Sequence, residues 1–262
     1  MDGADPDRWS LVAQDWSRLW GDLAAPAWDA LLRASEAGAG ARVLDVGCGS
    51  GDLLAHLEAR GLRVAGVDPA PGMLAQARAR LPGADLRPGD AESLTWGDGA
   101  FDLVTAVNAL QFADDVDAAL AELVRVTAPG GHVAVASWAE DSRNDLATIE
   151  AAVAAADGEE SLPEGELRGA GGLEALLADA GLTLVEAGLV DTPWDAADDE
   201  TLVRAVLLGE DDATIATTAP VVLAAAAPFR RTDGSYRLAC AFRYAVARRP
   251  APTRAAPAAP RA

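Results

Sequence analysis

The residues best suited to chemistry surround a glycine-rich turn in the first quarter of the chain. Asp45 ends an apolar run, and glycines follow at positions 47, 49 and 51 before a leucine-rich helical pattern begins. Glycine permits left-handed torsions and leaves no Cβ in the way of a ligand. The next helix points its free N–H groups and the positive end of its dipole at whatever lies above the turn. The pattern therefore predicts a small-molecule site beside a carboxylate.

Two further acids follow predicted strands. Asp68 ends the apolar run 63–67, and Asp90 comes shortly after a short run at 84–87. An acid in the position of Asp68 can accept hydrogen bonds from both hydroxyls of a ribose. We therefore expect a nucleoside-type ligand above the ends of these strands.

The glycine turn favours one class of nucleotide ligand over another. The dinucleotide fingerprint G-x-G-x-x-G fails in both frames, because Asp52 and Leu54 occupy the place of its last glycine. This disfavours a nicotinamide oxidoreductase. The Asp45 carboxylate would also repel a pyrophosphate, whereas an ammonium or a sulfonium would suit it. An acid just before G-x-G-x-G resembles motif I of the class I S-adenosylmethionine (SAM) methyltransferases.

Three later segments resemble the same family, in the family's order. They are an adenine-side motif, a fourth-strand motif and a helix–Pro-Gly-Gly–strand unit: Gly89-Asp90-Ala91, the Phe101–Val104 run with Asn108 and Gln111, and residues 120–138. The four motifs span residues 42–138, and the last strands agree to about residue 248. Together they identify the chain as similar to the branch that acts on small molecules.

The resemblance implies an α/β, Rossmann-like fold. Its seven-stranded, mostly parallel sheet has the order 3-2-1-4-5-7-6, with the last strand antiparallel, helices on both faces and a small helical cap. We expect the last strand over 236–248. The expected divisions are a helical lid (1–35), a methyltransferase domain (36–249) with a cap insertion at about 139–172 and a helical insertion at about 197–228, and a disordered tail (250–262).

The family's cofactor residues transfer to matching positions. The resemblance implies that Asp45 helps to hold the ammonium of SAM, that Asp68 holds the ribose, and that Asp90 binds the adenine edge. The full set expected to bind the cofactor is Asp45, Gly47, Cys48, Gly49, Asp68, Pro69, Met73, Asp90, Ala91, Glu92, Asn108 and Ala109.

An aromatic stripe near the N-terminus suggests an acceptor site. Trp9, Trp16 and Trp20 recur at helical spacing. The stripe fits either packing of a helix against the domain or a lid over the ligands, and both can hold. We expect an apolar or aromatic acceptor, for example in secondary metabolism, contacted by Trp16, Trp20, Gln111, Phe112 and Trp138.

Methyl transfer needs a general base only when the acceptor must lose a proton. Neither His56, inside a helix, nor His132, at the start of a strand, is expected to serve, so no catalytic residue is assigned and Gln111 and Glu140 are the candidates. The alternative is a SAM-binding protein of this fold that does not methylate but assists cyclisation or rearrangement, or binds SAM as a ligand.

Composition narrows the possible partners. A net charge of −20 and a pI near 4.3 disfavour nucleic acid and anionic membranes. Two cysteines and two histidines, far apart, predict no metal site and no disulfide framework. The acidic N-terminus predicts no signal peptide, and the run 213–229 is expected to fall short of a membrane span. We expect a cytoplasmic protein with a small-molecule substrate; nothing in the sequence predicts an oligomeric state.

Overall fold

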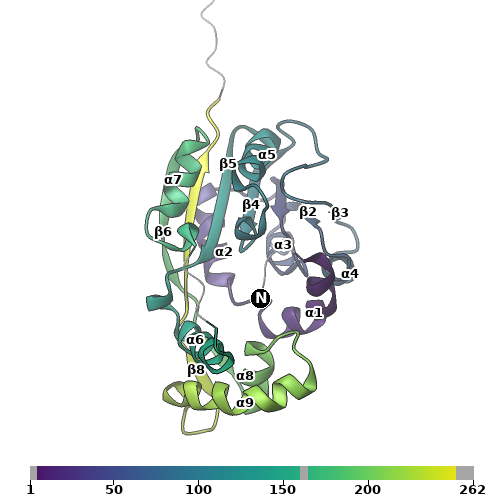
Figure 1. The fold of residues 1–262 in the computed structure, drawn as a ribbon. Helices are drawn as coiled ribbons and strands as arrows, with labels where there is room; N and C mark the ends of the chain where they lie inside the picture. Colours follow the sequence, from purple (N-terminus) through teal and green to yellow (C-terminus); the bar gives the residue numbers. More distant parts are fainter. Residues whose placement is uncertain (1–4, 160–164, 252–262) are drawn as a thin grey trace, which may run out of the picture.

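The computed structural model describes residues 5–159 and 165–251, and is built around a seven-stranded sheet (Figure 1). The strand order is β3-β2-β1-β4-β5-β9-β6, and β9 runs antiparallel to both of its neighbours. This confirms the predicted order, with β9 as the seventh strand. The strands are β1 (Arg42–Val46), β2 (Arg63–Asp68), β3 (Asp85–Pro88), β4 (Phe101–Val107), β5 (Thr127–Trp138), β6 (Thr183–Asp191) and β9 (Ala241–Arg248).

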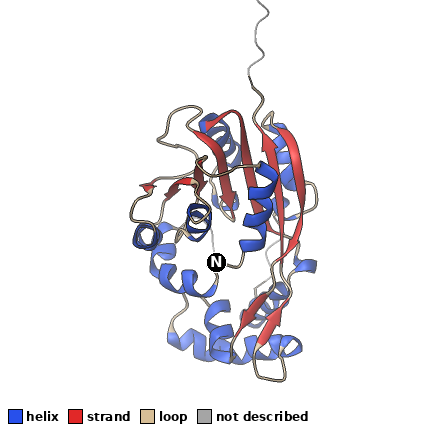
Figure 2. Cartoon of the chain, turned by 180° about the vertical axis from the view of Figure 1, so that it is seen from behind, coloured by secondary structure: helices blue, strands red, loops and turns tan. Residues whose placement is uncertain are grey.

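Helices cover both faces of the sheet, as Figure 2 shows from behind. The α-helices of the described residues, including those of the cap, are α1 (Pro6–Leu19), α2 (Ala25–Ser35), α3 (Asp52–Glu58), α4 (Pro71–Arg80), α5 (Val116–Val126), α6 (Asp145–Asp157), α7 (Gly172–Asp179), α8 (Asp199–Val206) and α9 (Asp212–Ala226). Alternate side chains of β9 point to opposite faces of the sheet. Phe242 and Val246 belong to the core that includes residues of α2, whereas Ala245 and Ala247 belong to the core that includes residues of α5 and α7. This period of two is what buries a strand on both sides.

A cap lies below the sheet in Figure 1 and consists of α6, α8 and α9 with a two-stranded ladder. The ladder pairs β7 (Trp194–Ala196) with β8 (Tyr236–Leu238). Strand β7 was not predicted. The cap therefore combines the two insertions that the sequence analysis placed apart; the domain boundaries themselves stay a prediction, and the expected tail lies outside the described residues from 252 on.

The expectation of one last strand over 236–248 is wrong, because the chain breaks between β8 and β9. Side chains at the start of α6 accept hydrogen bonds from backbone N–H groups between β8 and β9. Asp145 accepts the N–H of Ala239 at 2.6 Å through a carboxylate oxygen, and Asn144 accepts the N–H of Ala241 at 3.0 Å through its amide oxygen. These bonds bend the strand from the main sheet into the cap.

Helix α9 departs from a second expectation. With the turn that follows it, the segment Asp212–Phe229 is long and apolar enough, by length and composition, to cross a membrane, which the sequence analysis did not expect. It is the one such segment in the part of the chain that the structure describes. Within the fold it packs against α6 and α8, burying Thr218, Val222 and Ala226.

Candidate functional site

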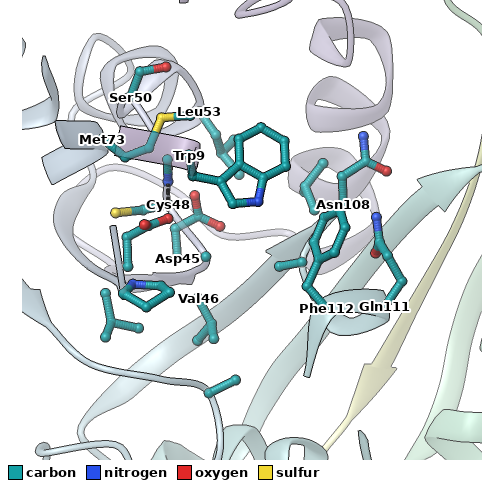
Figure 3. A pocket seen from close by; sticks show the side chains of 18 of the residues that line it. Trp9, Asp45, Val46, Cys48, Ser50, Leu53, Met73, Asn108, Gln111 and Phe112 are labelled. Carbon is teal, nitrogen blue, oxygen red and sulfur yellow. Dashed lines mark hydrogen bonds between the residues drawn. The ribbon is translucent and has the colours of Figure 1, made fainter. Parts of the chain in front are cut away.

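A cavity of about 450 Å³ lies at the carboxyl ends of the central strands, and Trp9 and Trp16 of α1 line part of it (Figure 3). It is lined by every residue that the sequence analysis expected at the cofactor, and by every residue expected at the acceptor: Asp45, Gly47, Cys48, Gly49, Asp68, Pro69, Met73, Asp90, Ala91, Glu92, Asn108 and Ala109, then Trp16, Trp20, Gln111, Phe112 and Trp138. The strand order reverses between β1 and β4, where open α/β sheets bind their ligands.

The glycine turn after β1 requires glycine at its first position. Gly47 has φ +72°, and a Cβ there would lie 2.5 Å from the Cβ of Ala109. Gly49 also has a left-handed φ, +51°, but a Cβ there would meet only the Met73 sulfur, at 4.0 Å. Glycine at 49 thus leaves space open in the cavity. That open cradle is what a ligand lying against the backbone needs.

Asp45 is a buried acid at the end of β1, with only 3% of its surface exposed. Burial raises the pKa of its carboxyl to about 7; a 2.7 Å hydrogen bond from the Thr105 hydroxyl opposes the shift, and the charge of Asp68 adds to it. An acid held in this way gains stability from a neighbouring cation. Asp45 lines the cavity and therefore fits an ammonium or a sulfonium there.

Asp68 ties the glycine turn to the end of β2. One carboxylate oxygen accepts the N–H of Gly49 and the other the N–H of Ala70, each at 2.8 Å. Burial raises the pKa of Asp68, while the two N–H bonds lower it. Each carboxylate oxygen can accept a second hydrogen bond, so Asp68 fits a pair of ribose hydroxyls.

Asn108 joins the ends of β4 and β5 in a backbone conformation that is rare outside glycine. Its φ is +50°, its N–H donates to the Ala136 carbonyl at 2.9 Å, and its amide oxygen accepts the Trp138 N–H at 3.2 Å. Such left-handed residues concentrate at ligand sites. The turn brings Ala109 against Gly47, which closes the cavity between the two strand ends.

A chain of aromatic rings borders the cavity and is called the aromatic wall below. Neighbouring ring centroids lie 4.9 to 6.5 Å apart along the series Phe112, Trp9, Trp16, Trp20, Trp138 and Phe242. Figure 3 shows Trp9 beside Phe112, between the Asp45 side of the cavity and the Gln111 side. Trp9 belonged to the stripe expected to pack or to form a lid, but neither Trp9 nor Phe242 was predicted as a contact of the acceptor. The stripe itself could have indicated Trp9, whereas nothing in the sequence linked Phe242 to it.

Helix α1 is fixed over the cavity at both ends. Near its start, the hydroxyl of Ser10 accepts the N–H of Gly72 at 3.0 Å, at the beginning of α4. Beyond its last residue, the Trp20 ring stacks on Trp194 of the cap with centroids 4.5 Å apart, and its indole N–H donates to the Ala205 carbonyl. The tryptophan stripe therefore both packs the helix and lines the cavity, which joins the two interpretations.

The structure does not support Glu140 as a general base. Its carboxylate lies outside the cavity and forms two hydrogen bonds with the Arg243 guanidinium, at 2.8 and 2.9 Å. Its own backbone N–H and Arg243 lower its pKa. Neither His56 nor His132 lines the cavity. Gln111 does, and its carboxamide can form hydrogen bonds with an acceptor but cannot act as a general base. No group of three or more potential metal ligands occurs among the described residues.

Sequence comparisons match the central part of the chain. Residues 44–135 match a family described as a methyltransferase domain. The malonyl-[acyl-carrier protein] O-methyltransferase of Erwinia billingiae is 41% identical over 107 residues, which are 41% of this chain and 43% of that protein. The chain spans about half the length of the curated relatives it matches.

Solved structures resemble nearly the whole fold. A putative methyltransferase from Bacillus halodurans has a TM-score of 0.60 at 18% identity, over 85% of this chain and 98% of that one. The [4+2]-cyclase SpnF has a TM-score of 0.59 at 18% identity, over 95% and 98%. At these identities the likeness concerns the fold.

Proposed function

Since this chain carries a class I SAM-dependent methyltransferase domain, we propose that it transfers the methyl group of SAM to a small apolar or aromatic molecule, for example in secondary metabolism. The observation that carries the proposal is the meeting of two sets of residues in one cavity. The residues expected at the cofactor and the rings of the aromatic wall line the same cavity. We also propose that the protein acts in the cytoplasm.

The residues at the carboxyl ends of the strands would each bind a different part of SAM. Asp45 would hold the ammonium, Asp68 the ribose hydroxyls, and Asp90 with the Ala91 N–H the adenine edge. Met73 would pack beside the adenine. When bound, SAM supplies a methyl group on a sulfonium, which an acceptor atom takes by in-line displacement.

The acceptor side would act by positioning the acceptor and excluding water. Ring faces of the aromatic wall can hold a flat molecule in one orientation beside the cofactor side of the cavity. Closely packed rings also displace water from the reacting atoms, which strengthens the electrostatic interactions inside the site. Gln111 would contact a polar group of the acceptor, since its amide can both donate and accept a hydrogen bond.

Turnover with a panel of hydroxylated and aminated aromatic compounds tests the proposal, with S-adenosylhomocysteine as the measured product. We expect turnover by the wild type and a fall in kcat/KM of about tenfold or more for Trp16→Ala, which opens the aromatic wall. Trp96→Ala is the matched control, because Trp96 does not line the cavity. Equal losses in the two variants would contradict a role of the wall in acceptor binding.

A second candidate is a protein that binds SAM without transferring its methyl group. The absence of Glu140, His56 and His132 from the cavity lining favours it, because the acids that do line the cavity include those expected to hold SAM, and no histidine among the described residues is there to take a proton. The fold likeness to a [4+2]-cyclase is compatible with such a role. SAM binding with no S-adenosylhomocysteine formed from any acceptor would support this candidate over methyl transfer.

A further inference from the structure

Every charged side chain that lines the cavity is acidic. Among the described residues no arginine and no histidine lines it, and the chain contains no lysine. The lining acids are Asp45, Asp52, Asp68, Asp90, Glu92 and Asp114. A ligand with a carboxylate or a phosphate would therefore enter without a protein cation to pair with it.

The negative charge of the lining is mostly uncompensated. In the described part of the chain, Asp52 is the one lining acid that forms an ion pair, with Arg80 at 2.7 Å. The others that have partners use neutral donors: Glu92, for example, accepts the backbone N–H of Asp114 at 2.8 Å. Neutral donors orient a carboxylate but leave its charge in place. The effect of the Asp68 charge on the pKa of Asp45 is consistent with this field.

The aromatic wall adds to the same preference. The face of an aromatic ring is negative, so it attracts cations and repels anions. The indole N–H of Trp20 is used by the Ala205 carbonyl. Gln111, at the mouth of β4, is polar but uncharged. The ring faces and the carboxylates that line the cavity thus both attract cations and repel anions.

We propose that this cavity selects its methyl acceptor by charge: it takes a neutral or cationic molecule and rejects one whose buried end bears a carboxylate or a phosphate. The inference rests on the proposed function. SAM brings its own ammonium, sulfonium and carboxylate, with a net positive charge that the lining acids would offset, so no cation remains in the described lining to pair with an anionic acceptor. A malonyl group, named in the relatives' activity, carries a carboxylate and does not fit this lining.

Equilibrium dialysis with two ligands of one shape tests the proposal without requiring turnover. The probes are 2-naphthylmethanol and 2-naphthoate at pH 8, with the full-length protein in saturating S-adenosylhomocysteine. We expect the alcohol to bind at least tenfold more tightly than the carboxylate. Equal binding, or tighter binding of the carboxylate, would overturn the proposal.

A pair of arginine variants controls for net charge. Gln111→Arg places a cation in the cavity lining and should raise the affinity for naphthoate at least tenfold relative to the affinity for the alcohol. Leu11→Arg adds the same charge at an 87% exposed position of α1 outside the lining, and should change neither. No gain from Gln111→Arg, or an equal gain from Leu11→Arg, would overturn the proposal.

Direct titration with SAM separates this result from the proposed function. If SAM does not bind but the order of the naphthyl ligands and the arginine effect hold, the proposed function fails and the charge selection stands. If SAM binds and is turned over while naphthoate binds as tightly as the alcohol, the proposed function stands and the charge selection fails.

Discussion

Replacing Asp45 by asparagine should make the protein relatively more stable as the pH rises. Burial raises the pKa of this carboxyl from 3.8 to about 7. In the unfolded chain the carboxyl has its ordinary pKa. Between those two values the folded protein keeps a proton that the unfolded chain has lost. The Asp45 contribution to the free energy of unfolding therefore falls as the pH rises through this window.

The magnitude follows from the width of the window. The protein has a pI near 4.3, so measurements are best begun at about pH 5.5, where the net charge keeps it soluble. From there to pH 7 is about 1.5 units, at about 1.4 kcal/mol for each unit, which gives about 2 kcal/mol. The carboxamide of the asparagine variant does not titrate in this range, and its oxygen can still accept the hydrogen bond from the Thr105 hydroxyl.

Urea unfolding of the wild type and Asp45→Asn at intervals from pH 5.5 to pH 8 measures this difference. The stability of the wild type minus that of the variant should fall by about 2 kcal/mol and then level off. Asp102→Asn is the control: Arg42 lowers the pKa of the Asp102 carboxyl, so its contribution is lost only below pH 4 and its difference stays constant. A difference for Asp45→Asn that does not depend on pH would refute the reasoning.

Two further predictions concern the cavity, and a third concerns Glu140 outside it. Calorimetry of SAM binding near pH 6 in two buffers of different ionisation enthalpy should show release of up to one proton by the wild type and none by Asp45→Asn, because a bound ammonium favours the ionised carboxyl. Gly47→Ala should cost about 1–3 kcal/mol of stability and weaken SAM binding, as its Cβ meets Ala109 at 2.5 Å; retained SAM affinity would contradict this. Glu140→Gln should lower stability by about 1–2 kcal/mol in urea by weakening the Arg243 pair, yet leave kcat nearly unchanged, whereas a base would lose most of its kcat.

Much of the cofactor side could be predicted from the sequence because parallel strands end at one edge of a sheet. Asp45, Asp68 and Asn108 each follow or end an apolar run, so their meeting in space follows from the strand order. The glycine spacing identified the turn in the same local way. Local pattern and global fold agree at these positions, which is typical of sequences that specify one structure.

Contacts between distant segments could not be predicted in this way. Glu140 pairs with Arg243, 103 residues later, and its carboxylate does not line the cavity. The break between β8 and β9 depends on Asn144 and Asp145, which accept backbone N–H groups from the far end of the chain. The place of Phe242 in the aromatic wall likewise depends on a contact between distant segments, because its ring packs against Trp138. Alternation of apolar and polar residues along a strand shows which face is buried. It does not show that side chains from a distant segment will take its backbone N–H groups and end its pairing.

Calorimetric titration with SAM, of the wild type and of Asp68→Ala, tests the central claim most directly. The wild type should bind in the micromolar range, and the variant should lose about 2 kcal/mol or more, about 30-fold in affinity, because two ribose hydroxyls would lose their acceptor. Asp15→Ala is the matched control, since it removes an exposed carboxylate of α1 that lies outside the cavity. No binding by the wild type, or equal binding by Asp68→Ala, would contradict the assignment of this cavity to SAM.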